Sequence, residues 1–200
     1  MKILYITGSF PPDHCGVGDY TSKIINNLQS CAELEVSLFY RSNWNLGNFF
    51  KYLRQLYSQK ANIYHFQYPT EGYGYSFLPL LLIVGLFFKN TVITIHEISS
   101  RNRLAYIYTQ FLVFFARRVV VSNILEYKHA CRFVFNKNKI VIIPIGSNIV
   151  KSNLNIKFKD RSIDLAYFGH IRPIKGIEPF LETVSLFDSK WKVKIIGQVL

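Results

Sequence analysis

The chain has 200 residues, half of them hydrophobic and 16% aromatic, which excludes a disordered chain and allows one full domain with a core. Its three cysteines are odd in number and far apart, which argues against a disulfide framework and fits a reducing cytosol. The formal net charge is +12, and residues 101–161 alone carry twelve Lys or Arg against two acidic residues. Such a field attracts anionic lipid, nucleic acid or phosphorylated substrates, although a merely soluble basic surface explains it as well.

Strand and helix patterns alternate with short connections, which predicts a parallel sheet covered on both faces. The expected strands lie at 2–7, 35–40, 62–66, 91–95, 118–121 and 139–143. The expected helices lie at 19–30, 77–88, 104–116 and 123–135, with one more whose buried stripe is Phe49, Phe50, Leu53, Leu56 and Tyr57. The fold class is therefore α/β, a doubly wound, Rossmann-like domain.

Two apolar stretches, 77–88 and 104–116, raise the question of a membrane. Both are too short to cross a bilayer, which needs about 20 residues. We expect helices packed on the sheet, with contact to a membrane surface as the alternative. The chain enters its first strand almost at once and shows no features of a secretory signal, so a cytoplasmic location is expected.

Three parts are expected along the chain. Residues 1–151 form the N-terminal Rossmann-like domain, and the polar, lysine-rich stretch 152–161 forms a linker. Residues 162–200 read as strand 163–168, helix 176–187 and strand 192–196. Two strands and one helix cannot bury their faces, so we expect 162–200 to be the incomplete start of a second Rossmann-like domain.

The first candidate site is the loop that contains Gly16 and Gly18, between the first strand and the first helix. Glycines there let backbone N–H groups approach a phosphate at a helix N-terminus. The alternative is a tight turn that needs glycine. The third glycine of a dinucleotide fingerprint is replaced by Thr21, and no Walker ending follows.

The second candidate site is the carboxyl edge of the predicted sheet, where ligands of this fold class bind. His96 directly follows the apolar run 92–95, so it should emerge at this edge together with Glu97. His65 lies inside its strand and is expected to be a packing residue. His14 stands between Asp13 and Cys15, and three adjacent residues cannot all face one ion, so no metal is expected.

The third candidate site is the turn from Gly169 to Gly176, again between a strand and a helix. Arg172 and Lys175 beside a helix N-terminus would neutralise a diphosphate, and arginine offers two parallel donors. The alternative is a turn with two solvated cations. The glycines at both ends of the turn favour the anion site.

Five segments in order resemble the retaining GT-B glycosyltransferases of family 4 over essentially all 200 residues. They are MKILYITGSFPPDHCGVGDYTSKIINNL, VITIHEIS, VVVSNILEY, IPIGSNI and IDLAYFGHIRPIKGIEPFLETV. The resemblance implies an enzyme that transfers a sugar from a nucleotide-sugar to a hydroxyl acceptor, in polysaccharide or lipid-linked glycan synthesis. Residues 1–151 would be its acceptor side and 162–200 the start of its donor side.

The resemblance also implies site roles. Gly16 and Gly18 would approach the donor, and His96 would contact the transferred sugar as the catalytic residue. Arg172 and Lys175, after Gly169, would hold the diphosphate without metal or cofactor. Three departures stand out: His170 replaces a common arginine, Glu97 is longer than the common aspartate, and the family's Glu-x7-Glu motif would lie beyond Leu200. The 200 residues alone are therefore expected to be inactive or nearly so.

Other partners and functions remain open on the sequence. The basic segment 101–161 suggests a peripheral position at an anionic membrane that carries a lipid-linked acceptor. A non-catalytic or split-enzyme subunit, completed by a partner chain, is the second reading. Nucleic acid is not expected as a partner, because no recognition motif accompanies the charge.

Overall fold

The computed structural model describes residues 1–146, 154, 156–169, 171, 175–188 and 190–199. The chain divides into two compact units, Met1–Ile149 and Val150–Leu200, and each is described by itself. The expected linker at 152–161 lies partly outside the described residues, and its last part contains a 3-10 turn, Phe158–Asp160.

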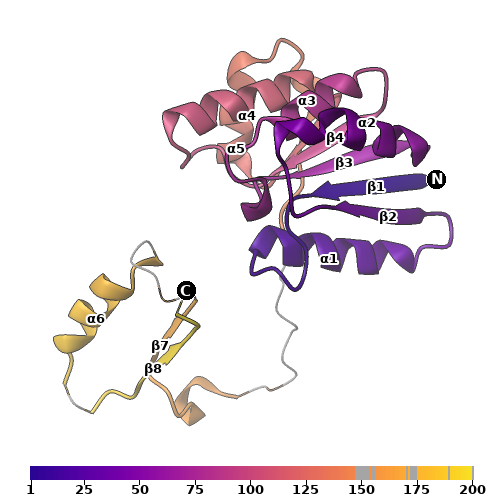
Figure 1. The fold of residues 1–200 in the computed structure, drawn as a ribbon. Helices are drawn as coiled ribbons and strands as arrows, with labels where there is room; N and C mark the ends of the chain where they lie inside the picture. Colours follow the sequence, from indigo (N-terminus) through magenta and orange to yellow (C-terminus); the bar gives the residue numbers. More distant parts are fainter. Residues whose placement is uncertain (147–153, 155, 170, 172–174, 189, 200) are drawn as a thin grey trace. The chain divides into compact units, whose positions relative to one another are not determined.

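Unit 1 is built on a six-stranded parallel sheet with the order β2-β1-β3-β4-β5-β6 (Figure 1). Its strands are β1 Lys2–Thr7, β2 Glu35–Tyr40, β3 Ile63–Tyr68, β4 Thr91–Ile95, β5 Arg118–Val121 and β6 Ile140–Ile142. The strand order reverses between β1 and β3, which makes their carboxyl ends the topological switch point. The predicted α/β class with a parallel, Rossmann-like sheet is confirmed.

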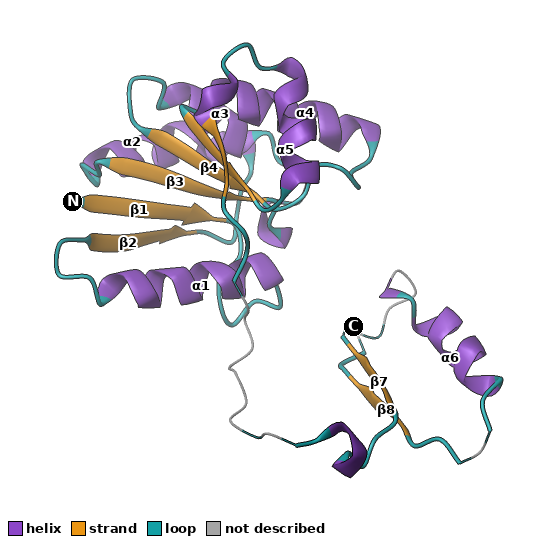
Figure 2. Cartoon of the chain, turned by 180° about the vertical axis from the view of Figure 1, so that it is seen from behind, coloured by secondary structure: helices purple, strands orange, loops and turns teal. Residues whose placement is uncertain are grey.

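Helices cover both faces of this sheet, unequally (Figures 1 and 2). The helices of unit 1 are α1 Gly16–Gln29, α2 Phe49–Ser58, α3 Leu78–Gly85, α4 Arg103–Phe115 and α5 Ile124–Ala130. α1 lies on one face, and α2 to α5 lie on the other. Short 3-10 turns occur at Leu46–Asn48, Glu71–Tyr73, Cys131–Phe133 and Lys137–Lys139.

Alternate residues of β1 supply two separate cores, because successive side chains of a strand point to opposite faces. Leu4 and Ile6 of β1 belong to the large core under α2 to α5. Ile3 and Tyr5 of the same strand join Ile25 of α1 in the small core on the other face. Strands β1 to β3 thus contribute to cores on both faces, whereas the buried hydrophobic residues of β4 to β6 belong to the large core alone.

Several details of the sequence analysis were wrong. α1 begins at Gly16 rather than near Asp19, so Gly16 and Gly18 lie in its first turn and not in the loop before it. Of the expected stripe of α2, Leu56 is buried and Phe49 and Leu53 pack partly buried against the core, whereas Phe50 is 80% exposed and Tyr57 40% exposed. The buried side also includes Tyr52, which was not expected. Tyr52 turns inward because its ring packs against Trp44 and its hydroxyl donates to the carbonyl of Asn43 at 2.6 Å. α5 ends at Ala130 rather than near residue 135, where exposed phenylalanines offer no buried face to continue the helix.

Unit 2 contains β7 Leu165–Phe168, α6 Ile177–Ser185 and β8 Val193–Ile196, and its two strands pair in parallel. Of its described hydrophobic residues, Ile177 alone is buried. Across the described parts of both units, no helix combines the length and apolar character needed to cross a membrane.

Candidate functional site

The loops that follow β1 and β3 interlock at the carboxyl edge of the sheet. A Cβ on Gly72 would lie 1.7 Å from the carbonyl oxygen of Gly8, and one on Gly8 would lie 2.6 Å from Thr70 Oγ1. The N–H of Gly72 donates to Ser9 Oγ at 2.8 Å. The two backbones can approach this closely only because both positions are glycine.

The start of α1 packs against the same loop. A Cβ on Gly18 would lie 3.0 Å from the carbonyl oxygen of Ser9, whereas Gly16 has open space around it. The cap residue Cys15 makes no side-chain hydrogen bond to the helix. Without a capping side chain, the first N–H groups of α1 are suited to an anion.

Asp13 anchors the loop before α1 to β2. Its Oδ2 accepts hydrogen bonds from the hydroxyl of Tyr40 at 3.0 Å and the N–H of Phe10 at 3.3 Å. This carboxylate therefore has a structural role. The described residues contain no group of three His, Cys, Asp or Glu side chains that could hold a metal ion.

His96 lies at the end of β4, next to the first turn of α1. Its backbone N–H donates to the carbonyl of Tyr68 at 2.9 Å, and its ring Nε2 lies 3.0 Å from Gln67 Oε1. The ring of Tyr20 meets the imidazole edge-on at 5.0 Å. The structure thus brings His96 and the turn that contains Gly16 and Gly18 to one edge of the sheet.

Burial lowers the pKa of His96 to about 4, so the ring is neutral near pH 7. With Gln67 Oε1 as its partner, Nε2 carries the proton and donates, which leaves Nδ1 as an acceptor. Gln67 is fully buried, and its Nε2 has no partner among the described residues. His96 can therefore offer a hydrogen bond to a polar ligand without placing a charge at the site, while the buried Gln67 orients its ring.

The other histidine of the sheet behaves as predicted. His65 stacks on Tyr5 at 4.8 Å, and its Nε2 lies 2.7 Å from Thr94 Oγ1. Burial, with a smaller effect of His96, lowers the pKa of His65 to about 4. Glu97, by contrast, is exposed and accepts a hydrogen bond from Ser100 Oγ.

A buried carboxylate holds the loop after β4 and was not foreseen. Glu126 Oε2 accepts from the N–H groups of Ile98 at 2.6 Å and Ser99 at 3.1 Å, and Oε1 accepts from Ser99 Oγ at 2.6 Å. Asn123 and Glu126 have the spacing of a helix cap, and Asn123 Oδ1 does accept from the N–H of Glu126. The carboxylate, however, binds the loop that carries His96.

A pocket of about 250 Å³ adjoins the end of β3. Tyr68, Phe77 and Tyr108 line it with their rings, and the guanidinium of Arg101 lies 5.2 Å from the centre of the Tyr68 ring. Arg101 Nε is buried without a partner among the described residues. Aromatic rings with a few polar groups are typical of a small-molecule site. A more open groove of about 690 Å³ shares residues 74–77 with this pocket.

Unit 2 contains the third predicted site only in part. Gly169 and Gly176 have positive φ angles of 149° and 75°, which glycine adopts readily. α6 begins directly after Gly176 without a capping side chain, and Lys175 beside it is exposed. Arg172 lies outside the described residues.

No model of a known protein family matches the chain, and no curated protein matches it either. The likeness to family 4 glycosyltransferases therefore depends on the motifs quoted above.

Proposed function

We propose that the protein is a retaining, GT-B-like glycosyltransferase, or the acceptor-side part of one, which transfers a sugar from a nucleotide-sugar to a hydroxyl acceptor. The observation that carries the proposal is the position of His96, which is hydrogen-bonded to Gln67 and packed on Tyr20 of the uncapped helix α1 at the carboxyl edge of the sheet. This edge is where ligands bind in doubly wound folds.

The proposed chemistry is displacement of a nucleoside diphosphate from the anomeric carbon. Negative charge develops on the leaving diphosphate, so fixed N–H dipoles and cations stabilise the transition state. In unit 1 the N–H groups at Gly16 to Gly18 would face donor oxygens, and His96 would bond a hydroxyl of the transferred sugar. In unit 2 Lys175, Arg172 and the start of α6 would hold the diphosphate, without a metal.

The pocket beside Tyr68 is proposed to take the acceptor. Aromatic faces pack against the apolar faces of sugar rings, and Arg101 would pair with an anionic group of a lipid-linked acceptor. The proposed location is the cytoplasmic side of a membrane.

The test is a donor screen, by hydrolysis and by transfer, with the 200-residue chain alone and with this chain fused to a donor domain in one polypeptide. We expect transfer only from the fused form, and a 10²- to 10³-fold lower kcat/KM for His96→Gln. His14→Gln changes an exposed histidine and serves as the matched control. Unchanged kcat/KM for His96→Gln would contradict the assigned role.

A second candidate is an acceptor-binding subunit that needs a partner chain. It is favoured by the exposed apolar side chains of unit 2, of which Phe168 is 70%, Leu186 84% and Val199 74% exposed. Another polypeptide could cover them. Activity that appears only when a separate donor-side chain is added would select this candidate over a single-chain enzyme.

A further inference from the structure

We propose that the outer side of α4 and its neighbours docks on an anionic lipid bilayer, independently of whether the protein transfers sugars. The apolar part of this surface, called the apolar face here, consists of Leu81, Leu104, Ile107, Phe111, Phe114 and Phe133. Unlike the basic composition alone, this surface combines exposed apolar side chains with unpaired cations.

The helix α4 is apolar on two opposite sides. Its inner side buries Leu112 and Val113 together with Thr109, and so attaches the helix to unit 1. Its outer side exposes Leu104 by 81%, Ile107 by 44%, Phe111 by 51% and Phe114 by 48%. The spacing of three, four and three residues places these four side chains on one helical stripe. A helix at a purely aqueous surface would carry polar side chains there.

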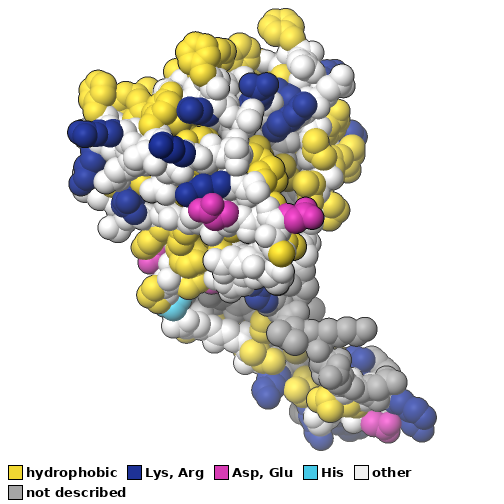
Figure 3. Space-filling view, turned by 90° about the vertical axis from the view of Figure 1, so that its right-hand side faces the viewer, with side chains coloured by type: hydrophobic (Ala, Val, Ile, Leu, Met, Phe, Trp, Pro, Cys, Tyr) yellow, Lys and Arg dark blue, Asp and Glu magenta, His cyan; other side chains and the backbone are white. Residues whose placement is uncertain are grey.

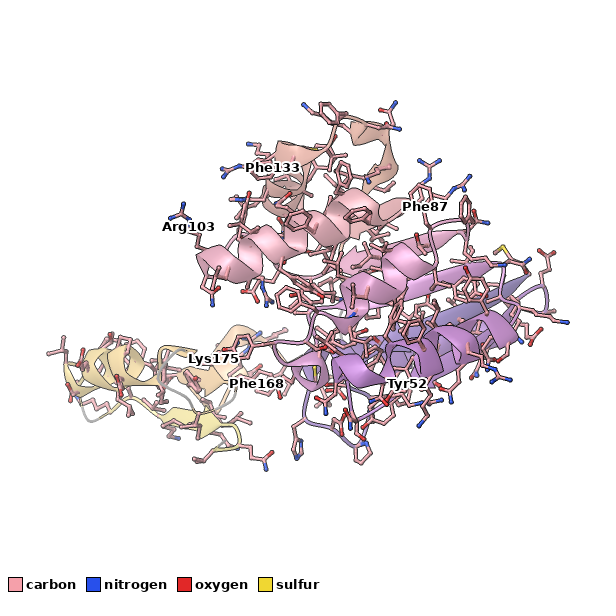
Figure 4. All side chains as sticks on the ribbon, turned by 45° about the horizontal axis from the view of Figure 1, so that its top comes forward. Tyr52, Phe87, Arg103, Phe133, Phe168 and Lys175 are labelled. Atoms are coloured by element: carbon pink, nitrogen blue, oxygen red, sulfur yellow. The ribbon has the colours of Figure 1, made fainter. Side chains whose placement is uncertain are left out.

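The apolar face continues on neighbouring elements. Phe133, 61% exposed, closes a hollow of about 350 Å³ with Ile107, Phe111 and Phe114 of α4. Leu81 of the adjacent helix α3 is 40% exposed. Phe133 and the exposed Phe87 project outward from the helical layer in Figure 4. The exposed apolar area is thus contiguous, which marks an interaction surface.

Exposed cations occur on the elements that form the apolar face and on the elements that follow them in the chain. Arg103, Arg117, Lys128, Arg132 and Lys137 are exposed, and none of them pairs with a carboxylate within the described part of the chain. Arg103 points away from unit 1 at the start of α4 (Figure 4). Between residues 98 and 146 the single acidic side chain is Glu126, which is buried and already bonded to the loop after β4.

Apolar and basic side chains lie next to one another over the helical layer of unit 1 in Figure 3. This combination of apolar and basic side chains indicates which kind of partner binds the surface. A second copy of the chain would oppose two positive surfaces, and nucleic acid would leave the aliphatic side chains in water. An anionic bilayer receives both components, because its headgroups attract Lys and Arg while its acyl boundary accepts Leu, Ile and Phe.

The length of α4 fits a position in the plane of the interface. Thirteen residues span about 20 Å, which is shorter than the hydrocarbon core of a bilayer. Leu104 also lines the pocket that contains Arg101. Docking on the outer side of α4 would therefore place that pocket next to lipid headgroups.

The test is co-sedimentation of the 200-residue chain with vesicles of phosphatidylcholine alone or with roughly one third phosphatidylglycerol. We expect at least about tenfold tighter binding to the anionic vesicles, weakened by about 0.5 M salt. The double variant Phe111→Ser/Phe114→Ser should bind them about tenfold more weakly. The matched control is Leu181→Ser/Leu186→Ser, which removes two exposed apolar side chains from α6 and the residue after it and should bind as the unchanged chain does.

A second measurement separates docking from misfolding of the double variant. The chain already contains Trp44 and Trp191, so Phe111→Trp is compared with the unchanged chain. The additional indole fluorescence should shift to the blue on addition of anionic vesicles and be quenched by brominated acyl chains. Equal binding to neutral and anionic vesicles, equal loss in both double variants, or an indole that brominated lipid does not quench would each overturn the proposal. So would dimerisation of the chain that Phe111→Ser/Phe114→Ser abolishes, or tighter binding to DNA than to vesicles.

Discussion

The two units use the same strand–helix–strand pattern, but they differ in how much of it is buried. In unit 1, β1 has neighbours on both sides, and five of its six residues are buried. In unit 2, β7 and β8 have only each other among the described residues, so Ile195 and Ile196 remain 42% and 41% exposed. A parallel strand becomes a core element only when further strands and a helix on each face surround it.

The candidate site residues of the two units differ in the same way, in how firmly buried contacts hold them. Those of unit 1 are held by buried contacts, such as the hydrogen bond between His96 and Gln67. Those of unit 2 lie on a turn with little beneath it, where Lys175 is exposed. Preorganised groups act on a transition state without rearrangement, so unit 1 should bind its ligand part in a ready conformation and unit 2 should need further packing.

The largest expected effect comes from separating the units. A fragment of residues 1–149 should unfold in one cooperative thermal transition, because it retains both cores. A fragment of residues 150–200 should show no cooperative transition, because it buries too little apolar surface to offset its chain entropy. Circular dichroism and amide NMR dispersion measure both. A dispersed amide spectrum from the 150–200 fragment would show that unit 2 folds by itself, contrary to this prediction.

Truncating one leucine in each unit should give the next largest effect. Leu82 is fully buried in α3, so Leu82→Ala should lower the free energy of unfolding by about 2–5 kcal/mol. Leu181 of α6 is 48% exposed, and Leu181→Ala should cost less than about 1 kcal/mol. Urea denaturation of the whole chain measures both variants. Equal losses would show that unit 2 is buried by contacts other than those described.

Removing the charge of Glu126 should have a smaller, local effect. A glutamine side chain at this position would keep one acceptor oxygen but could not accept from Ile98, Ser99 and the Ser99 hydroxyl as the carboxylate does. Glu126→Gln should therefore cost about 1–3 kcal/mol and speed hydrogen exchange at the Ile98 and Ser99 amides. Glu97→Gln, at an exposed position, is the control and should leave both amides protected.

The sequence predicted those features that depend on local pattern. The bounds of β1, β2, β4 and β5 were predicted correctly, because each is an apolar run with polar or turn residues beside it. The inner side of α2 was predicted in part: Phe49, Leu53 and Leu56 do face the core. Aromatic residues occur all around that helix, so the burial of Tyr52 against Trp44 could not be read from the sequence. For the same reason the outer stripe of α4 could not be told from its core stripe.

The sequence predicted which strand ends form the candidate site, but not the hydrogen bonds and close backbone contacts between them. His96 was placed at the carboxyl edge by the end of its strand, whereas its bond to Gln67 depends on the register between β3 and β4. The contact of Gly8 with Gly72 joins positions 64 residues apart, and no local motif announces it. The bond from Glu126 to the N–H of Ile98 joins positions 28 residues apart, so no local pattern indicates it.

The smallest expected effect is a mild acid sensitivity of unit 1. His65 and His96 have pKa values near 4 when folded, because burial disfavours their charged forms, and near 6.5 when unfolded. The unfolded chain therefore binds more protons below pH 6.5, so stability is full above this pH and falls as the pH drops toward 4. From pH 7 to pH 6 the free energy of unfolding should fall by roughly 1 kcal/mol. His65→Gln should reduce this fall in urea titrations, whereas His14→Gln, at an exposed position, should not. An equal fall in all three proteins would show that His65 does not carry the acid sensitivity of unit 1.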